Sequence, residues 1–200
     1  MKKSSLANVK HMNKKLLIMI FIFTVLLKDS YGKTPVGIFM TAADYQNNKI
    51  TYTEGDPQGE IKIRIHHFFW SMPTITVVAK GRKHAFRKSD LYGFIDSNND
   101  VYRFYNNMEY QLAEAGNIYI YIHQNNIAQS KGFIVVNTYY FSSTADGKIE
   151  RLTLDNLKTV YTGNEKFIDL LDQYNGNISS YDKQNKTYKI NYFFSKASRQ

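Results

Sequence analysis

The sequence has no cysteine among its 200 residues. Disulfide bonds, thiolate-ligated zinc, iron–sulfur clusters and thiol catalysis are therefore excluded, as is the lipid-modified cysteine of bacterial lipoproteins. Proline is scarce, with three residues, and no proline-rich or glycine-rich linker divides the chain. A chain of this length without a linker is expected to form one domain that is stabilised by its own apolar core.

The longest hydrophobic run lies near the N-terminus. Leu16–Leu27 is an uncharged run of 12 residues that follows five lysines, and Ser30 and Gly32 place small residues at the −3 and −1 positions of a cleavage site. These are the three regions of a secretory signal peptide. Twelve residues at 1.5 Å each span about 18 Å, too little to cross roughly 30 Å of hydrocarbon. We predict a cleaved signal peptide over residues 1–32, with its start at Met1 or Met12.

The net charge of +9 overstates the basicity of the mature protein. Residues 1–32 hold six of the 26 basic residues and one of the 17 acidic residues, so the predicted domain at 33–200 carries +4. This balance, together with export, argues against a nucleic-acid partner. We expect a periplasmic, extracellular or outer-membrane-associated protein, with membrane contact only through the signal peptide before cleavage.

Short segments rich in β-branched and aromatic residues make up most of the remainder. They lie at 50–54, 60–67, 74–79, 91–95, 101–105, 117–123 and 133–141. In the second of these, isoleucines at 61, 63 and 65 alternate with Lys62, Arg64 and His66. A period of two with one polar face is typical of an antiparallel sheet that is buried on one side.

Two regions indicate helices instead. Thr41 to Asp44 has the pattern of a helix N-cap, so a short helix is expected to end near Asn47. Residues 152–161 and a run of apolar residues at helical spacing behind Asn164 predict a helical pair, followed by a last strand at 188–194. The predicted fold is α+β, with a predominantly antiparallel β-sheet, a short N-terminal helix and a C-terminal helical pair.

Oxygen-bearing side chains occur at Asp96, Asn98 and Asp100, at the alternate positions of a calcium loop. Val101 replaces the glycine of the EF-hand loop, Asn107 replaces its bidentate glutamate, and the flanking segments predict strands rather than helices. A similar turn recurs at Asp182 with a lysine among the would-be ligands. We interpret the stretch as the tip of a hairpin and expect no bound metal.

The best candidate for a binding site is the segment KGRKHAFRK, residues 80–88. We select Arg82, Lys83, Arg87 and Lys88, together with Trp70 just upstream, as ligand-binding residues for an anionic envelope component or a glycan. Aromatic residues, at 15% of the chain with sixteen tyrosines, would suit sugar rings as well. The alternative is a solvated strand edge whose charges prevent edge-to-edge pairing.

The segments GIFMTAADYQNNKITY and NLKTVYTGNEKFIDLLDQYN, with the close YDKQNKTYKINYFF, resemble exported proteins of Bacteroidetes-type bacteria. The resemblance spans most of the mature chain and implies an envelope location. No activity is known for those proteins, so the resemblance assigns no site residues.

No common catalytic pattern occurs in the chain. The motifs G-x-S-x-G, H-E-x-x-H and G-x-x-x-x-G-K-[ST] are absent, and Ser180 to Lys183 matches S-x-x-K without its companion motifs. We therefore expect no cofactor and favour a non-enzymatic binding or structural module. The alternative is a hydrolase of envelope or extracellular polymers whose acid–base pair is hidden among scattered carboxylates.

Cleavage after Gly32 is the first testable consequence. N-terminal sequencing of the exported protein is expected to begin at Lys33, because the small residues Ser30 and Gly32 occupy the positions that signal peptidase reads. A mature protein that retains Leu16–Leu27 would show that the segment is an anchor.

Overall fold

The computed structural model describes residues 36–51, 61–68, 70–79 and 81–199, apart from the side chains of residues 66–71. The chain divides into two compact units, Met1–Thr34 and Pro35–Gln200. The predicted signal peptide and most of the predicted strand at 50–54 lie outside the described residues. The fold described is that of the second unit.

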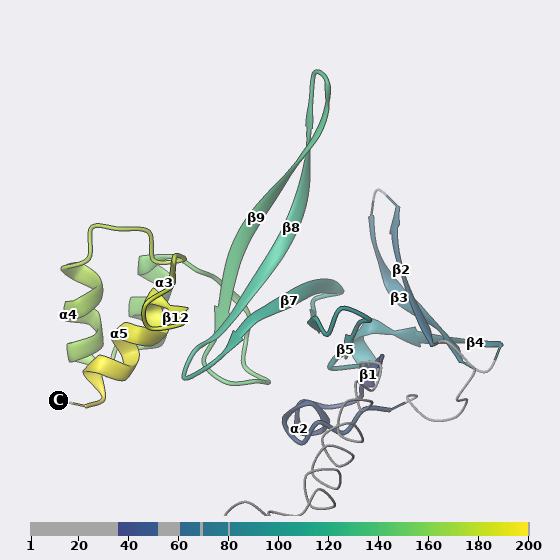
Figure 1. Cartoon of the computed structure of the whole chain (residues 1–200), viewed down its shortest axis with the longest axis horizontal. Helices are drawn as coiled ribbons and strands as arrows, with labels where there is room; N and C mark the ends of the chain where they lie inside the picture. The colour runs from purple at the N-terminus through teal and green to yellow at the C-terminus, as the bar shows by residue number, and fades with distance from the viewer. Residues whose placement is uncertain (1–35, 52–60, 69, 80, 200) are drawn as a thin grey trace, which may run out of the picture. The chain divides into compact units, whose positions relative to one another are not determined.

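The larger sheet has seven strands in the order β1-β5-β6-β7-β8-β9-β10, all antiparallel (Figure 1). These strands are β1 Gly37–Phe39, β5 Gly93–Ile95, β6 Val101–Tyr105, β7 Met108–Ala115, β8 Tyr119–Gln129, β9 Gly132–Ser142 and β10 Glu150–Arg151. A second sheet has three strands, β2 Lys62–Phe68, β3 Trp70–Ala79 and β4 Arg82–Arg87. A 3-10 turn at Lys88–Asp90 follows β4 in the chain. β11 Tyr181–Asp182 and β12 Thr187–Tyr188 form a two-stranded antiparallel ribbon.

Four helices complete the described fold. They are α2 Ala42–Gln46, α3 Leu154–Val160, α4 Glu165–Asp172 and α5 Lys189–Ala197. The N-caps predicted for α2 and α4 are present, since the Thr41 and Asn164 side chains accept hydrogen bonds from backbone N–H groups of the first turn. Among the described residues, no helix combines the length and apolarity that a membrane span requires. The predicted α+β class with a mostly antiparallel sheet is confirmed. The C-terminal region holds three helices rather than the predicted pair, because α5 takes the place of the expected last strand.

The predicted last strand at 188–194 is wrong. Only Thr187 and Tyr188 are extended, and α5 begins at Lys189. Alternation of aromatic residues suggested a strand, but Ile190, Phe194 and Ala197 lie at helical spacing and turn one face toward the core. Burial of that face outweighs the moderate strand preference of the aromatic residues.

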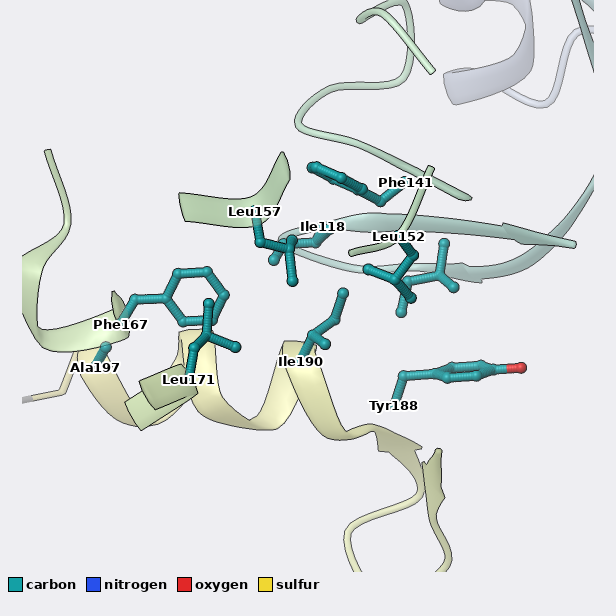
Figure 2. Packing of buried hydrophobic residues seen from close by; sticks show 10 residues of the cluster. Ile118, Phe141, Leu152, Leu157, Phe167, Leu171, Tyr188, Ile190 and Ala197 are labelled. Carbon is teal, nitrogen blue, oxygen red and sulfur yellow. The ribbon is translucent and has the colours of Figure 1, made fainter. Parts of the chain in front are cut away.

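The main core lies between the sheet and the three C-terminal helices. Ile118 just before β8 and Phe141 of β9 meet Leu157 of α3, Phe167 of α4 and Ile190 of α5, as Figure 2 shows. All five side chains are buried. The alternate residues of β8 and β9 that face this cluster are apolar, which is why the predicted period of two marks these strands correctly.

A polar network holds α5 against the turn between β7 and β8. The Asn191 side chain accepts a hydrogen bond from the Ile118 backbone N–H at 2.8 Å and donates to the Ile118 carbonyl at 2.9 Å. The Glu114 carboxylate accepts from the Tyr188 backbone N–H at 2.7 Å and from Asn191 at 2.8 Å. A Cβ on Gly116 would lie 2.6 Å from the Asn191 amide, so this position requires glycine for close approach.

Tyr161 provides a test of the core. Its hydroxyl is buried without a hydrogen-bond partner among the described residues, and burial raises its pKa to about 12. Tyr161→Phe is expected to leave the free energy of unfolding at pH 7 unchanged or to raise it by about 1 kcal/mol, because it removes an unsatisfied polar group.

The same substitution is expected to reduce the loss of stability at high pH. Between about pH 10 and pH 12 the tyrosine loses its proton in the unfolded chain but keeps it in the fold, so stability falls across this window. Urea denaturation at pH 7, 9 and 11 measures both effects. A loss above 1 kcal/mol at pH 7 would show that the hydroxyl makes a stabilising bond.

Candidate anion-binding face

The candidate site lies on the three-stranded sheet, where β3 is the central strand. The pairing places Lys62 of β2 and Lys83 of β4 on either side of Val78, and Arg64 beside Thr76. Residues directly opposite one another in an antiparallel ladder point to the same face. The register therefore decides which cations share a face.

One face of this sheet is apolar and packs into the fold. Ile63 of β2, Ile75 and Val77 of β3 and Phe86 of β4 contact a cluster that includes Phe94 of the larger sheet. Ile75 and Val77 are fully buried. This burial fixes which way each strand faces, because a slip of one residue would turn the isoleucines to solvent.

The other face is basic. It carries Lys62 and Arg64 from β2 and Lys83 and Arg87 from β4, all exposed. Between them, β3 contributes three half-buried side chains that are short, Thr74, Thr76 and Val78. No aspartate or glutamate occurs in the sequences of the three strands.

The spacing of these cations makes them act together. Neighbouring strands lie about 4.8 Å apart, so the cations of β2 and β4 are separated by roughly 10 Å across the central strand. That separation is close to the Debye length of about 8 Å at physiological ionic strength, so their potentials overlap. The side chains of β3 between these cations are short, so they do not hold an extended anionic chain or a charged surface away from them.

The five residues selected from the sequence do not lie together. Lys83 and Arg87 are on the basic face, whereas Arg82 is exposed at the first residue of β4 with its side chain on the opposite face. Lys88 is 1% exposed and does not reach the surface. Trp70 begins β3, but its side chain lies outside the described part of the structure.

Lys62 and Arg64 complete the face and are missing from the sequence-based selection. The alternation in β2 predicts that the two share a polar face. Joining them to Lys83 and Arg87 needs the register of β2 and β4 on β3, which is set by contacts between segments distant in sequence.

Lys88 has a structural role. Its ammonium group forms an ion pair with Glu109 of β7 and donates a hydrogen bond to the Asn107 carbonyl at 3.0 Å. The ammonium also lies 5.9 Å from the centre of the Phe104 ring. A buried ammonium requires such compensation, and this pairing explains why Lys88 is not available to a ligand.

A second buried cation, Arg103, is likewise satisfied within the fold. It is 5% exposed and donates hydrogen bonds to the Gly147 carbonyl at 2.7 Å and to the Tyr121 hydroxyl at 3.3 Å. The rings of Tyr92, Tyr105 and Tyr121 lie within 6 Å of its guanidinium carbon. Both buried cations are therefore held by partners within the fold.

The turn at Asp96 is the tip of the β5–β6 hairpin, as the sequence predicts. The Asp96 carboxylate accepts hydrogen bonds from the backbone N–H groups of Asn98 and Asp100, both at 2.9 Å, and Asn99 has φ of 68°. The related turn at Asp182 binds the backbone N–H groups of Gln184 and Asn185 in the same way. Within the described residues, no three histidine, aspartate or glutamate side chains gather in a way that could hold a metal.

The chain matches no protein-family model, and no curated protein or solved structure is significantly similar to it. Its function is therefore argued from its own residues.

Truncating Lys88 tests its structural role. Lys88→Met is expected to lower the free energy of unfolding by about 3–5 kcal/mol, because it leaves the Glu109 carboxylate, 10% exposed, without its counter-ion. Adding Glu109→Leu to Lys88→Met is expected to restore most of the loss. Lys83→Met, on the exposed face of the neighbouring strand, is the control and should change stability little. A Lys88→Met variant as stable as the parent would contradict this role; urea denaturation decides.

Proposed function

We propose that this protein is a non-enzymatic, exported binding module of the bacterial envelope and that it binds anionic groups through the basic face of its three-stranded sheet. One observation carries the proposal: Lys62, Arg64, Lys83 and Arg87 share an exposed face whose three strands contain no acidic residue. The excess of one sign attracts ligands of the opposite sign and raises their local concentration.

The shape of the face favours a partner that is itself extended. The cations are spread over two strands, with short side chains between them, rather than converging on a pocket. Phosphate or carboxylate groups that repeat along an acidic polysaccharide or over a phospholipid surface would meet several cations at once. Each lysine or arginine near such a surface contributes about 1 kcal/mol.

The carboxylates nearest the core support binding rather than hydrolysis. Glu109 is taken by Lys88, and Glu114 by the backbone of Tyr188 and by Asn191. A hollow beside α5 has no carboxylate among its described lining residues, which are Asn185, Thr187, Tyr192, Ser195, Lys196 and Arg199. The hydrolase alternative requires two carboxylates that converge on a substrate, and these groups have structural partners instead.

The envelope location rests on the N-terminal sequence. A lysine-rich start, an uncharged run of 12 residues and a small-residue cleavage site support export. The periplasmic or outer surface of a bacterial cell is rich in phospholipid head groups and acidic glycans, which suits a basic face that contains no acid.

Neutralising the face tests the proposal. The triple variant Arg64→Ser, Lys83→Ser and Arg87→Ser is expected to bind vesicles of phosphatidylglycerol and phosphatidylcholine about 100-fold more weakly than the parent, because three contributions of about 1 kcal/mol are lost. Binding of the parent should also fall steeply with salt, since the Debye length shortens to about 3 Å at 1 M. Co-sedimentation measures binding to the vesicles, and calorimetry measures binding to an acidic polysaccharide.

A charge-matched control distinguishes the effect of this face on binding from the effect of the chain's net charge. Lys148→Ser, Lys166→Ser and Lys183→Ser remove three exposed cations from other elements and should retain most of the affinity. Equal losses in both triples would show that the chain binds through net charge alone. Undiminished binding in the first triple would show that the face only protects a strand edge, and its unfolding would assign the charges to the structure.

A further inference from the structure

The hairpin of β8 and β9 carries apolar side chains in solvent. Its strands pair over eleven residues, from Tyr119 with Ser142 to Gln129 with Gly132, and Figure 1 shows them as one long twisted ribbon. Near the tip, Phe133 is 73% exposed, Val135 61%, Ile127 47% and Ile134 41%. Exposed apolar residues of this kind, gathered over three adjacent cross-strand pairs, mark a contact surface.

Among the described strands, none pairs with either edge of the ribbon in its outer half. In the described structure, β7 pairs with β8 only up to Ile122, and β10 pairs with β9 only at Tyr140 and Phe141. The outer edge of β9 at residues 132–138 therefore presents backbone N–H and C=O groups that no described strand uses. Edge strands of natural proteins normally carry charges, prolines or bulges that block pairing.

This edge carries none of those protections. Lys131 is the only lysine, arginine, aspartate or glutamate between Glu114 and Asp146, and no proline occurs there. The β9 sequence GFIVVNT favours a strand. The other outer edge of the ribbon belongs to β8, whose sequence there is QNNIAQ and largely polar. The edge that can accept another strand is therefore that of β9.

The chemistry of the edge decides between a lipid and a strand as its partner. Insertion of the tip into hydrocarbon would carry Lys131 in first and would leave the backbone groups of both edges unsatisfied. A strand satisfies the backbone groups and covers the apolar side chains together. Because this edge is neutral in a chain of net positive charge, it is also a surface on which two copies meet without repulsion.

We propose that two copies of this chain pair through β9, edge to edge and antiparallel, about a two-fold axis at Ile134. In this register Ile134 faces Ile134 of the second copy, and Phe133 faces Val135 in both directions, so that apolar residues meet apolar residues. The two Lys131 side chains lie six residues apart along the ribbon, roughly 20 Å, well beyond the Debye length of about 8 Å. Such a contact is isologous and closes with two copies.

The absence of cysteine makes the register directly testable, because any disulfide reports only an introduced residue. Ile134→Cys is expected to form a disulfide-linked dimer on mild oxidation, since opposite residues of an antiparallel ladder have Cα atoms about 4.5–5.5 Å apart, within disulfide range. A mixture of Phe133→Cys and Val135→Cys should cross-link between the two variants more than within either.

Ile127→Cys is the matched control. Ile127 is also exposed and pairs directly with Ile134, but it lies on β8, one strand further from the proposed axis. The two copies of residue 127 would be about 14 Å apart, too far for a disulfide. Cross-linking of Ile127→Cys as strong as that of Ile134→Cys would overturn the β9 contact.

Sedimentation equilibrium of the purified full chain tests association without cross-linking. Val135→Lys should raise the dimer dissociation constant at least tenfold, and Asn126→Lys, which adds the same charge at the directly opposite exposed position of β8, should not. The apolar run Leu16–Leu27 is present in every variant, so any association that it causes is common to all of them. A difference in dissociation constant between variants therefore comes from the β8–β9 hairpin. Unchanged melting temperatures show that the variants fold.

Two results would overturn the proposal. One is a parent chain that stays monomeric at every concentration. The other is a Val135→Lys variant that associates like the parent. If the parent is monomeric but binds phosphatidylcholine vesicles and Val135→Lys does not, the tip contacts lipid, and the proposal of a second copy fails.

Discussion

The buried ion pair between Lys88 and Glu109 supports the orientation of the basic face that the burial of Ile75 and Val77 sets. Lys88 follows directly after β4, and Glu109 belongs to β7 of the larger sheet, so the pair ties the two sheets together across the Phe94 cluster. Removing either partner would leave the other charge buried and unpaired, which is strongly destabilising. With Lys88 held inside and Phe86 in the apolar cluster, alternation along β4 turns Lys83 and Arg87 outward.

A comparable constraint acts at the other end of the fold. The helical layer is held to the sheet by the hydrogen bonds of Asn191 and Glu114 with the turn after β7 and with the start of α5. These polar groups satisfy backbone atoms that burial would otherwise leave unpaired. The chain has no disulfides, so specific positions of its helices depend on such networks and on the apolar contacts of Ile190 and Leu171.

The sequence predicts the strands whose local and tertiary preferences agree. β6 and β9 were predicted within a residue of their observed bounds, because β-branched and aromatic residues alternate there. β7 was missed, since Met108–Ala115 reads MEYQLAEA and consists mostly of helix-favouring residues that only pairing with β6 and β8 holds extended. Of the residues selected for the site, Lys83 and Arg87 lie exposed on one face of β4. The burial of Lys88 and the presence of Lys62 and Arg64 depend on long-range register, which local patterns do not contain.

The two proposed surfaces differ in exposure from the buried cations of the fold. The buried cations Lys88 and Arg103 have partners within the chain that account for their presence. The exposed cations Arg64, Lys83 and Arg87 of the three-stranded sheet and the apolar residues at the tip of the β8–β9 ribbon face solvent, where charge of one sign and apolar area each carry a cost. A solubilising surface would mix the two signs and would break the apolar edge with a lysine. The basic face does not mix signs, and the ribbon has only Lys131 at its turn, so both surfaces are more readily explained by partners than by stability.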